Sequence, residues 1–157
     1  MKQDWLYEGK PFAPDYEKID PEYVGFVYQI TDTETGQIYI GQKRLRKTKT
    51  LPITKTRKRR QKSLVESDWR DYFSSSQTIK ENVEAGLSGR YEREILRFGY
   101  SKGDLHILEA IEQINRGVLW DDKYLNGIIN IRVHKKHISN KLKQEFIDDG
   151  ISVSKDS

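Results

Sequence analysis

The sequence Val24-Gly25-Phe26-Val27-Tyr28-Gln29-Ile30, with Ile38-Tyr39-Ile40-Gly41 shortly after it, decides the fold. Both stretches are rich in β-branched and aromatic residues, which favour strands. The six residues between them, Asp32-Thr33-Glu34-Thr35-Gly36-Gln37, are polar and include a glycine suited to a tight turn. We therefore predict a β-hairpin. Its two tyrosines, Tyr28 and Tyr39, share one sheet face if the turn sets that register.

Further along the chain, the patterns mostly predict helices. We expect a helical turn over residues 67–73, a helix from Gln77 to about Ala85, and a helix over 102–116 with Ser101 as its cap. Residues 93–98 fit a strand or a helix, and a last amphipathic helix is predicted over about 139–148. This order predicts an α+β fold, in which helices flank a small central antiparallel sheet made of the hairpin and a third strand.

Positive charge is concentrated in residues 43–62. These residues contain eleven Lys or Arg and no acid, whereas the remaining 17 basic and 24 acidic residues sum to −7. A polyanion such as DNA or RNA favours this distribution, because each neutralised phosphate releases counterions. The alternative is a solvated loop that only aids solubility. We expect a long mobile loop, and we predict nucleic-acid contacts by Lys43, Lys47, Arg57, Lys58, Arg59, Arg60, Lys62 and, downstream, Arg70.

The composition of the 157 residues excludes several other classes of protein. The absence of cysteine excludes disulfides, thiolate zinc sites and a cysteine nucleophile. The N-terminus lacks the apolar run of a signal peptide, and no stretch of eighteen apolar residues occurs. We expect a cytoplasmic protein with no membrane partner. His134-Lys135-Lys136-His137 has only a superficial metal-binding spacing, because two histidines without a third ligand are usually surface residues.

The hairpin resembles the GIY-YIG endonuclease superfamily. Tyr39-Ile40-Gly41 matches the second half of the motif, whereas Phe26-Val27-Tyr28 stands where Gly-Ile-Tyr is usual, with Gly25 displaced by one position. Residues 68–76 and the tail after Asn126 look most like a phage-associated branch with a long basic insertion. Further resemblances follow in family order at Ser74-Ser75-Ser76, Arg93-Glu94-Ile95-Leu96, Leu105-His106-Ile107-Leu108-Glu109 and Tyr124-Leu125-Asn126-Gly127.

The resemblance implies a nuclease-like domain over residues 23–132. We expect an irregular N-terminal arm over 1–22, running over the surface, and a C-terminal helix and tail over 133–157. The implied activity is metal-dependent cleavage of phosphodiester bonds, with Mg²⁺ (or Mn²⁺) as the cofactor and Glu109 as its ligand. A hard oxygen ligand suits Mg²⁺, which keeps most of its waters. Glu112, one helical turn away, is the alternative metal ligand.

The resemblance also implies roles for the other site residues. Tyr28 would lie near the attacking water, as its base or through a metal-bound hydroxide, and Tyr39 would hydrogen-bond the phosphate or the water. Asn126 would anchor the wall of the active site. The family places an arginine on a helix soon after YIG, but Leu51-Pro52 interrupts any regular helix here. We predict Arg46 for that role and then Arg44, and the other possible residues are Arg57, Arg59, Arg60 and Arg70.

Our leading hypothesis is an endonuclease that acts on double-stranded DNA. One alternative is a catalytically inactive nucleic-acid-binding module that kept the fold, which the departure at Gly25-Phe26 favours. A second alternative is an RNA-directed nuclease, because phosphate contacts carry no base information. A third is a basic module that binds an acidic protein. The sequence does not predict the oligomeric state.

Overall fold

The computed structural model describes residues 3–56, 58–59 and 61–150. A mixed five-stranded sheet has the order β2-β1-β7-β3-β4. The strands are β1 (Leu6–Tyr7), β2 (Lys10–Pro11), β3 (Gly25–Asp32), β4 (Ile38–Arg44) and β7 (Tyr91–Gly99). β1 runs parallel to β7, and the other neighbouring pairs are antiparallel. The predicted α+β fold is confirmed, and residues 93–98 belong to the third strand beside the hairpin. The expectation of a purely antiparallel sheet of three strands is wrong, because the N-terminal segment adds β1 parallel to β7 and β2 beside β1.

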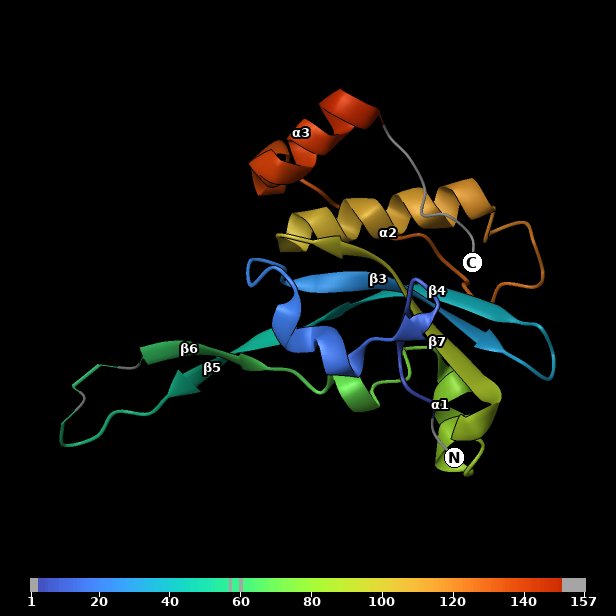
Figure 1. Cartoon of the computed structure of the whole chain (residues 1–157), viewed down its shortest axis with the longest axis horizontal. Coiled ribbons are helices and arrows are strands. Elements are labelled where there is room, and N and C mark those ends of the chain that lie inside the picture. The colour runs from blue at the N-terminus through green and yellow to red at the C-terminus, as the bar shows by residue number, and fades with distance from the viewer. Residues whose placement is uncertain (1–2, 57, 60, 151–157) are drawn as a thin grey trace.

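Helices lie on both sides of this sheet (Figure 1). They are α1 (Gln77–Glu84), α2 (Lys102–Arg116) and α3 (Asn140–Asp149), with the short 3-10 helices η1 (Ala13–Lys18), η2 (Trp69–Asp71), η3 (Ser88–Arg90) and η4 (Lys135–His137). The Ser101 hydroxyl caps α2 by accepting from the backbone N–H of Asp104, and the Ser139 hydroxyl caps α3 in the same way. The predicted Ser101 cap is confirmed, and the helix predicted from about residue 139 begins at Asn140. In the part of the chain that the structure describes, no helix combines the length and apolar composition needed to cross a bilayer.

The side chains of β3 alternate between two cores. Phe26 and Tyr28 pack with Trp5 and Trp69 on one face, whereas Val27 packs with Ile40, Leu108, Val118, Tyr124 and Leu142 on the face that α2 covers. In the hairpin register, Tyr28 lies opposite Gly41, and Tyr39 lies opposite Ile30. Tyr28 and Tyr39 therefore share the face away from α2, as the sequence predicts for one hairpin register.

The expectation of an irregular surface arm is wrong for residues 5–18. Trp5 and Phe12 are each 1% exposed, and Tyr16 is also buried. The Trp5 ring lies 5.0 Å from that of Phe26, and its indole N–H donates to the Trp69 carbonyl at 2.7 Å. The physical reason is the aromatic content of this segment, because each ring removes a large apolar area from water. The segment therefore forms part of the core.

The expectation of a long loop is also wrong for half of residues 43–62, which belong to β4, β5 and β6. β5 (Arg46–Leu51) and β6 (Gln61–Glu66) form a two-stranded antiparallel ribbon that projects away from the body (Figure 1). The two strands pair along their whole length, from Arg46 opposite Glu66 to Leu51 opposite Gln61. This backbone pairing orders the segment although its strands have no apolar face to bury. Leu45 is fully buried and anchors the base of the ribbon. Arg57 and Arg60, two of the predicted nucleic-acid contacts, lie outside the described residues.

The turn of the main hairpin depends on Asp32. Its carboxylate accepts hydrogen bonds from the backbone of Glu34 and from Arg90, whose Nη2 lies 2.6 Å away. Chiefly because of Arg90, the pKa of Asp32 falls to about 2. A lowered folded-state pKa stabilises the fold above the unfolded pKa of about 3.9, and this contribution is lost as the pH falls toward 2.

We expect Asp32→Asn to lower the free energy of unfolding at pH 7 by about 2 kcal/mol, the size that such a pKa shift implies. Urea unfolding measured at several pH values between 7 and 2 tests this. The difference between wild type and variant should shrink below pH 4. Asp122→Asn, at an exposed position, is the control and should leave stability unchanged at every pH. A difference that persists undiminished at pH 2 would contradict the assignment.

Candidate active site

Tyr28 and Gly41 form the centre of the hairpin motif. The Tyr28 ring is fully buried, and its hydroxyl passes directly over Gly41. A Cβ atom at position 41 would lie 2.5 Å from the Tyr28 oxygen, so any side chain there would displace the phenol. The glycine of Tyr39-Ile40-Gly41 therefore leaves space for the hydroxyl of Tyr28. Because β4 is the edge strand, this hydroxyl lies at the margin of the sheet.

The Tyr28 hydroxyl is buried, and no described group makes a hydrogen bond of normal geometry with it, although the Tyr72 hydroxyl lies near enough to interact with it. Burial raises its pKa well above the usual value, and Tyr72, Tyr39 and the Glu109 carboxylate raise it further. The phenol is therefore neutral at physiological pH. A buried hydroxyl without a partner costs about 1–3 kcal/mol of stability. Such an unsatisfied group, directed at a sheet margin, is the feature of this site that packing does not explain.

Two further hydroxyl groups lie beside Tyr28. The Tyr39 oxygen is 3.0 Å from the Ser75 hydroxyl, and the Tyr39 ring centroid is 6.3 Å from that of Tyr28. Tyr72 packs edge-on against Tyr28, with its ring centroid 6.0 Å away. Tyr72 was not predicted as a site residue. It lies two residues before the Ser74-Ser75-Ser76 element, and that proximity was the only sequence signal for it.

The ammonium group of Lys43 lies beside this group of tyrosines. Its ammonium lies 4.1 Å from the centroid of the Tyr72 ring and 2.6 Å from an Asp68 oxygen. On β4 it follows Gly41 by two residues and therefore faces the same side of the sheet. Lys43 was predicted as a nucleic-acid contact in the basic segment, and the structure places it within the tyrosine cluster.

Glu109 projects from α2 toward the same strand. One of its oxygens accepts from the Gln42 side-chain amide at 3.2 Å, and the same amide nitrogen lies 2.9 Å from His106 Nδ1. Burial raises the pKa of Glu109, although the hydrogen bond from Gln42 opposes this. A partly desolvated carboxylate with one neutral partner suits a cation ligand. Gln42 and His106 were not predicted as site residues.

Glu112, the alternative metal ligand, lies in a different environment. It is fully buried, and its carboxylate lies 2.9 Å from Arg116 Nε one turn along α2. Arg116 in turn donates to the side chain of Gln29 at 2.6 Å. Glu112 is therefore committed to a buried ion pair within the fold.

Asn126 holds the edge strand. Its side-chain oxygen accepts from the Ile40 N–H at 3.0 Å, and its amide nitrogen donates to the Ile40 carbonyl at 2.8 Å. Gln113 donates to the same carbonyl at 3.2 Å. These bonds occupy the unpaired side of β4 between Tyr39 and Gly41. Asn126 thus fixes the backbone that carries the motif, and it positions the site without contributing a free polar group.

The arginines predicted for catalysis are placed differently. Arg46 donates from Nη1 to the carbonyls of Pro21 and Tyr23, at 2.8 and 2.9 Å, and so holds the chain that enters β3. Arg70 is bonded to Glu66 at 2.7 Å and lies over the Trp69 ring. Arg44 lies opposite Gly25 and faces the side of the sheet opposite Lys43. Arg46 and Arg70 are thus engaged in the fold, and the tyrosine cluster takes its cation from Lys43.

The remaining predicted nucleic-acid contacts lie on the ribbon. Lys47 in β5 and Lys62 in β6 are exposed, as are Lys58 and Arg59 between the two strands. Ser67 at the foot of the ribbon bonds the Arg44 carbonyl at 2.5 Å. The ribbon therefore begins where the motif strand ends, beside the candidate active site.

The side chains near Glu109 determine whether a divalent ion could bind at this site. Among the described residues, no group of three or more His, Cys, Asp or Glu side chains converges as a metal cage. A single carboxylate is nevertheless a sufficient protein ligand for Mg²⁺, which keeps several waters and takes phosphate oxygens as further ligands. Glu109, a partly desolvated carboxylate on α2 beside the Gln42 amide, fits such an open site.

Comparison with known families agrees with this geometry. Residues 5–129 match the family model described as "Putative endonuclease segE, GIY-YIG domain". The match covers most of the chain, so the protein belongs to the GIY-YIG endonuclease superfamily, in the segE branch. It begins at Trp5 and so includes the N-terminal segment that packs into the core. No curated protein and no solved structure gives a significant match.

Proposed function

We propose that the protein is a divalent-metal-dependent endonuclease that hydrolyses phosphodiester bonds in double-stranded DNA. The family supports nuclease activity, and the metal and the substrate are our inference. The observation that carries the proposal is the unsatisfied, buried Tyr28 hydroxyl at a sheet margin, in electrostatic range of the partly desolvated Glu109 carboxylate. Tyr28 makes no well-formed hydrogen bond to a described residue, and Glu109 has the neutral Gln42 amide as its hydrogen-bond partner, so water or phosphate oxygens at this edge of the sheet would give both groups further polar partners.

Each residue then has a distinct task. Glu109 would hold Mg²⁺ (or Mn²⁺), and a bound divalent ion supplies charge neutralisation and acidifies water. Tyr28 is a neutral phenol, so it would hydrogen-bond and orient the attacking water instead of acting alone as a base. Tyr39, supported by Ser75, would donate to a phosphate oxygen. Lys43 would face the developing negative charge, in place of the arginine that we predicted from the sequence.

The ribbon supports DNA over RNA as the substrate. Strands of six residues extend about 20 Å, and the major groove of B-DNA, about 12 Å wide, admits a two-stranded ribbon. The major groove of A-form RNA is too deep and narrow for side chains to read. Exposed lysines along the ribbon would neutralise the flanking phosphates. A module that only bound phosphates would not need the unsatisfied phenol at the base of the ribbon.

The experiment that tests the substrate compares two duplexes of the same sequence, one DNA and one RNA, at equal concentration in Mg²⁺. We expect strand breaks in the DNA duplex, none in the presence of EDTA, and little or no cleavage of the RNA. Equal cleavage of both duplexes would exclude a role for the ribbon in choosing DNA. Tight binding without cleavage of either duplex would support the inactive binding module.

Neutralising the ribbon should weaken binding to DNA of any sequence. For Lys47→Gln with Lys49→Gln, we expect the slope of log affinity against log salt to become shallower by about 0.9 for each phosphate that the ribbon no longer neutralises. Fluorescence anisotropy of a labelled duplex in EDTA measures this. The charge-matched control is Lys10→Gln with Lys18→Gln, two exposed lysines outside the ribbon. An unchanged affinity and slope in the ribbon variant would mean that the ribbon is only a solvated extension.

A further inference from the structure

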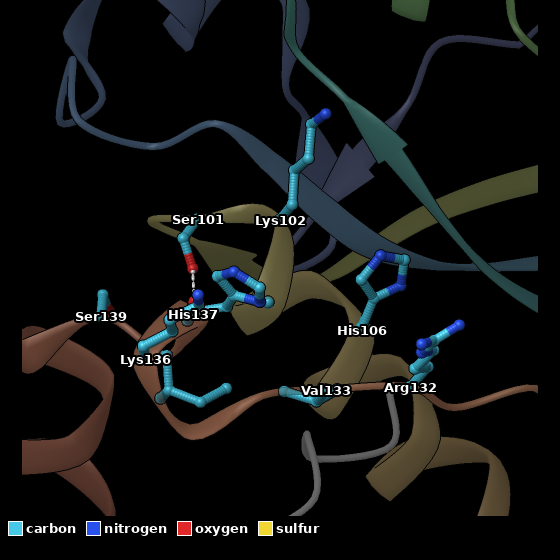
Figure 2. A pocket seen from close by; sticks show the side chains of 10 residues that line it. Ser101, Lys102, His106, Arg132, Val133, Lys136, His137 and Ser139 are labelled. Atoms are coloured by element: carbon cyan, nitrogen blue, oxygen red, sulfur yellow. Dashed lines mark hydrogen bonds between the residues drawn. The ribbon is translucent and has the colours of Figure 1, made fainter.

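A basic cavity of about 520 Å³ opens beside the first turns of α2. One wall comes from the start of α2, with Lys102 and His106, and the other from the segment that runs beside it, with Arg132, Lys136 and His137 (Figure 2). Lys102, Arg132 and Lys136 are exposed, and no ion pair joins any of them to another described residue. None of the described residues that line the cavity is acidic. The residues around the cavity thus carry positive charge and no acid, and the Lys102 side chain extends away from the segment that holds Val133 and Lys136 (Figure 2).

The two walls are fixed against each other. The Ser101 hydroxyl donates to the His137 carbonyl at 2.7 Å (Figure 2), and a Cβ atom at Gly103 would lie only 2.3 Å from that oxygen. Asp104, which follows Gly103 on α2, is fully buried, and its carboxylate accepts from the Ser139 N–H at 2.8 Å and from the Tyr100 N–H at 3.0 Å. Asp104 therefore ties the segments together and does not neutralise the cavity.

The cavity adjoins the candidate active site through His106. His106 lines the cavity, and its Nδ1 lies 2.9 Å from the Gln42 nitrogen that also bonds Glu109. Along α2, Lys102 precedes Glu109 by seven residues, which corresponds to about 10 Å of helix. At about 3.4 Å of duplex axis for each phosphate of a strand, this span corresponds to about three nucleotides.

We propose that this cavity is a phosphate subsite, which binds the backbone of the substrate strand about three nucleotides from the bond that is cut. The proposal rests on the proposed function and extends it to residues that the family motif does not include. It also gives His137 and Lys136 of the 134–137 stretch a role in binding. No Phe, Tyr or Trp lines the cavity, so a base would find no ring of that kind for stacking. The chemistry therefore favours a backbone phosphate over a free nucleotide.

The first test observes the cavity directly. The chain has only three histidines, and His106 and His137 line the cavity whereas His134 does not. A 5′-phosphorylated thymidine dinucleotide should shift the imidazole NMR signals of His106 and His137 saturably, and should shift that of His134 less. The shifts should disappear in the variant Lys102→Gln with Lys136→Gln. Signals that do not move, or that still move in the variant, would overturn the proposal.

The second test distinguishes a strand subsite from a nucleotide site. In EDTA, the affinity of the same double variant for a DNA duplex should fall about tenfold, with a salt slope shallower by about 0.9 for the one phosphate contact that is lost. The control Lys10→Gln with Lys18→Gln should match wild type. Dinucleotide binding without any effect on duplex affinity would overturn the proposal. If the duplex result holds while Glu109→Gln cleaves as fast as wild type, the subsite stands and the assigned catalytic centre fails.

Discussion

Glu109→Gln should lower the rate of DNA cleavage by a factor of about 10² or more, because the variant replaces the metal-binding carboxylate with a neutral amide of the same size. Duplex affinity in EDTA should be unchanged or slightly higher, since one negative charge is removed beside the bound phosphates. Stability should not fall. A carboxyl group whose pKa is raised by burial disfavours the folded state above that pKa, so its replacement relieves a penalty at pH 7.

Glu112→Gln is the matched control, one helical turn away. It breaks the buried pair with Arg116 and leaves that guanidinium without its carboxylate, so stability should fall by about 3–5 kcal/mol. The cleavage rate of the folded fraction should be retained. Single-turnover cleavage and urea unfolding of both variants measure the two effects. The reverse pattern, in which Glu112→Gln alone loses cleavage, would move the metal site by one turn.

Tyr28→Phe should lower the cleavage activity without lowering the stability of the fold. Cleavage should fall by about 10²-fold or more, because the hydroxyl that orients the attacking water is gone. Stability should stay equal or rise by about 1 kcal/mol, since the hydroxyl is buried and makes no hydrogen bond of normal geometry to a described residue. A tyrosine that served only in packing would leave activity unchanged when its hydroxyl is removed.

Tyr91→Phe supplies the control for this substitution. Tyr91 is equally buried, but its hydroxyl accepts a hydrogen bond from the Asn82 side chain at 2.7 Å. Its removal should therefore lower stability by about 1 kcal/mol and leave cleavage intact. Tyr28→Phe should thus lose activity and keep its stability, whereas Tyr91→Phe should lose stability and keep its activity. Thermal unfolding measures the stability of each variant, and single-turnover cleavage measures its activity. Loss of activity in both variants alike would mean that Tyr28 acts through the fold.

Short-range patterns account for the parts of the fold that the sequence predicted well. The hairpin, the Ser101 cap of α2 and the extent of α3 depend on residues within a few positions of each other. The register of the hairpin then places Tyr28 and Tyr39 on one face. Glu109 was predicted from a family pattern on one helix, and its approach to Gln42 on β4 followed only in the folded chain.

Long-range contacts explain what the sequence did not reveal. The prolines of the N-terminal segment suggested an irregular surface arm, but Trp5 packs against Phe26 and Trp69 from distant parts of the chain. Arg46 follows the motif closely in sequence, yet its guanidinium turns to the Pro21 and Tyr23 carbonyls. Lys43 reaches Tyr72 because the chain folds back after the ribbon. Tertiary contacts of this kind leave no local periodicity to read.

The most direct test of the central claim is the conversion of supercoiled plasmid DNA to nicked or linear forms by the wild-type protein, measured against Mg²⁺ concentration with Glu109→Gln beside it. We predict cleavage by wild type that saturates with Mg²⁺ and stops in EDTA, and a rate lower by about 10²-fold or more for the variant at every Mg²⁺ concentration. Cleavage by wild type in EDTA, or equal rates for the two proteins, would contradict a metal-dependent nuclease centred on Glu109.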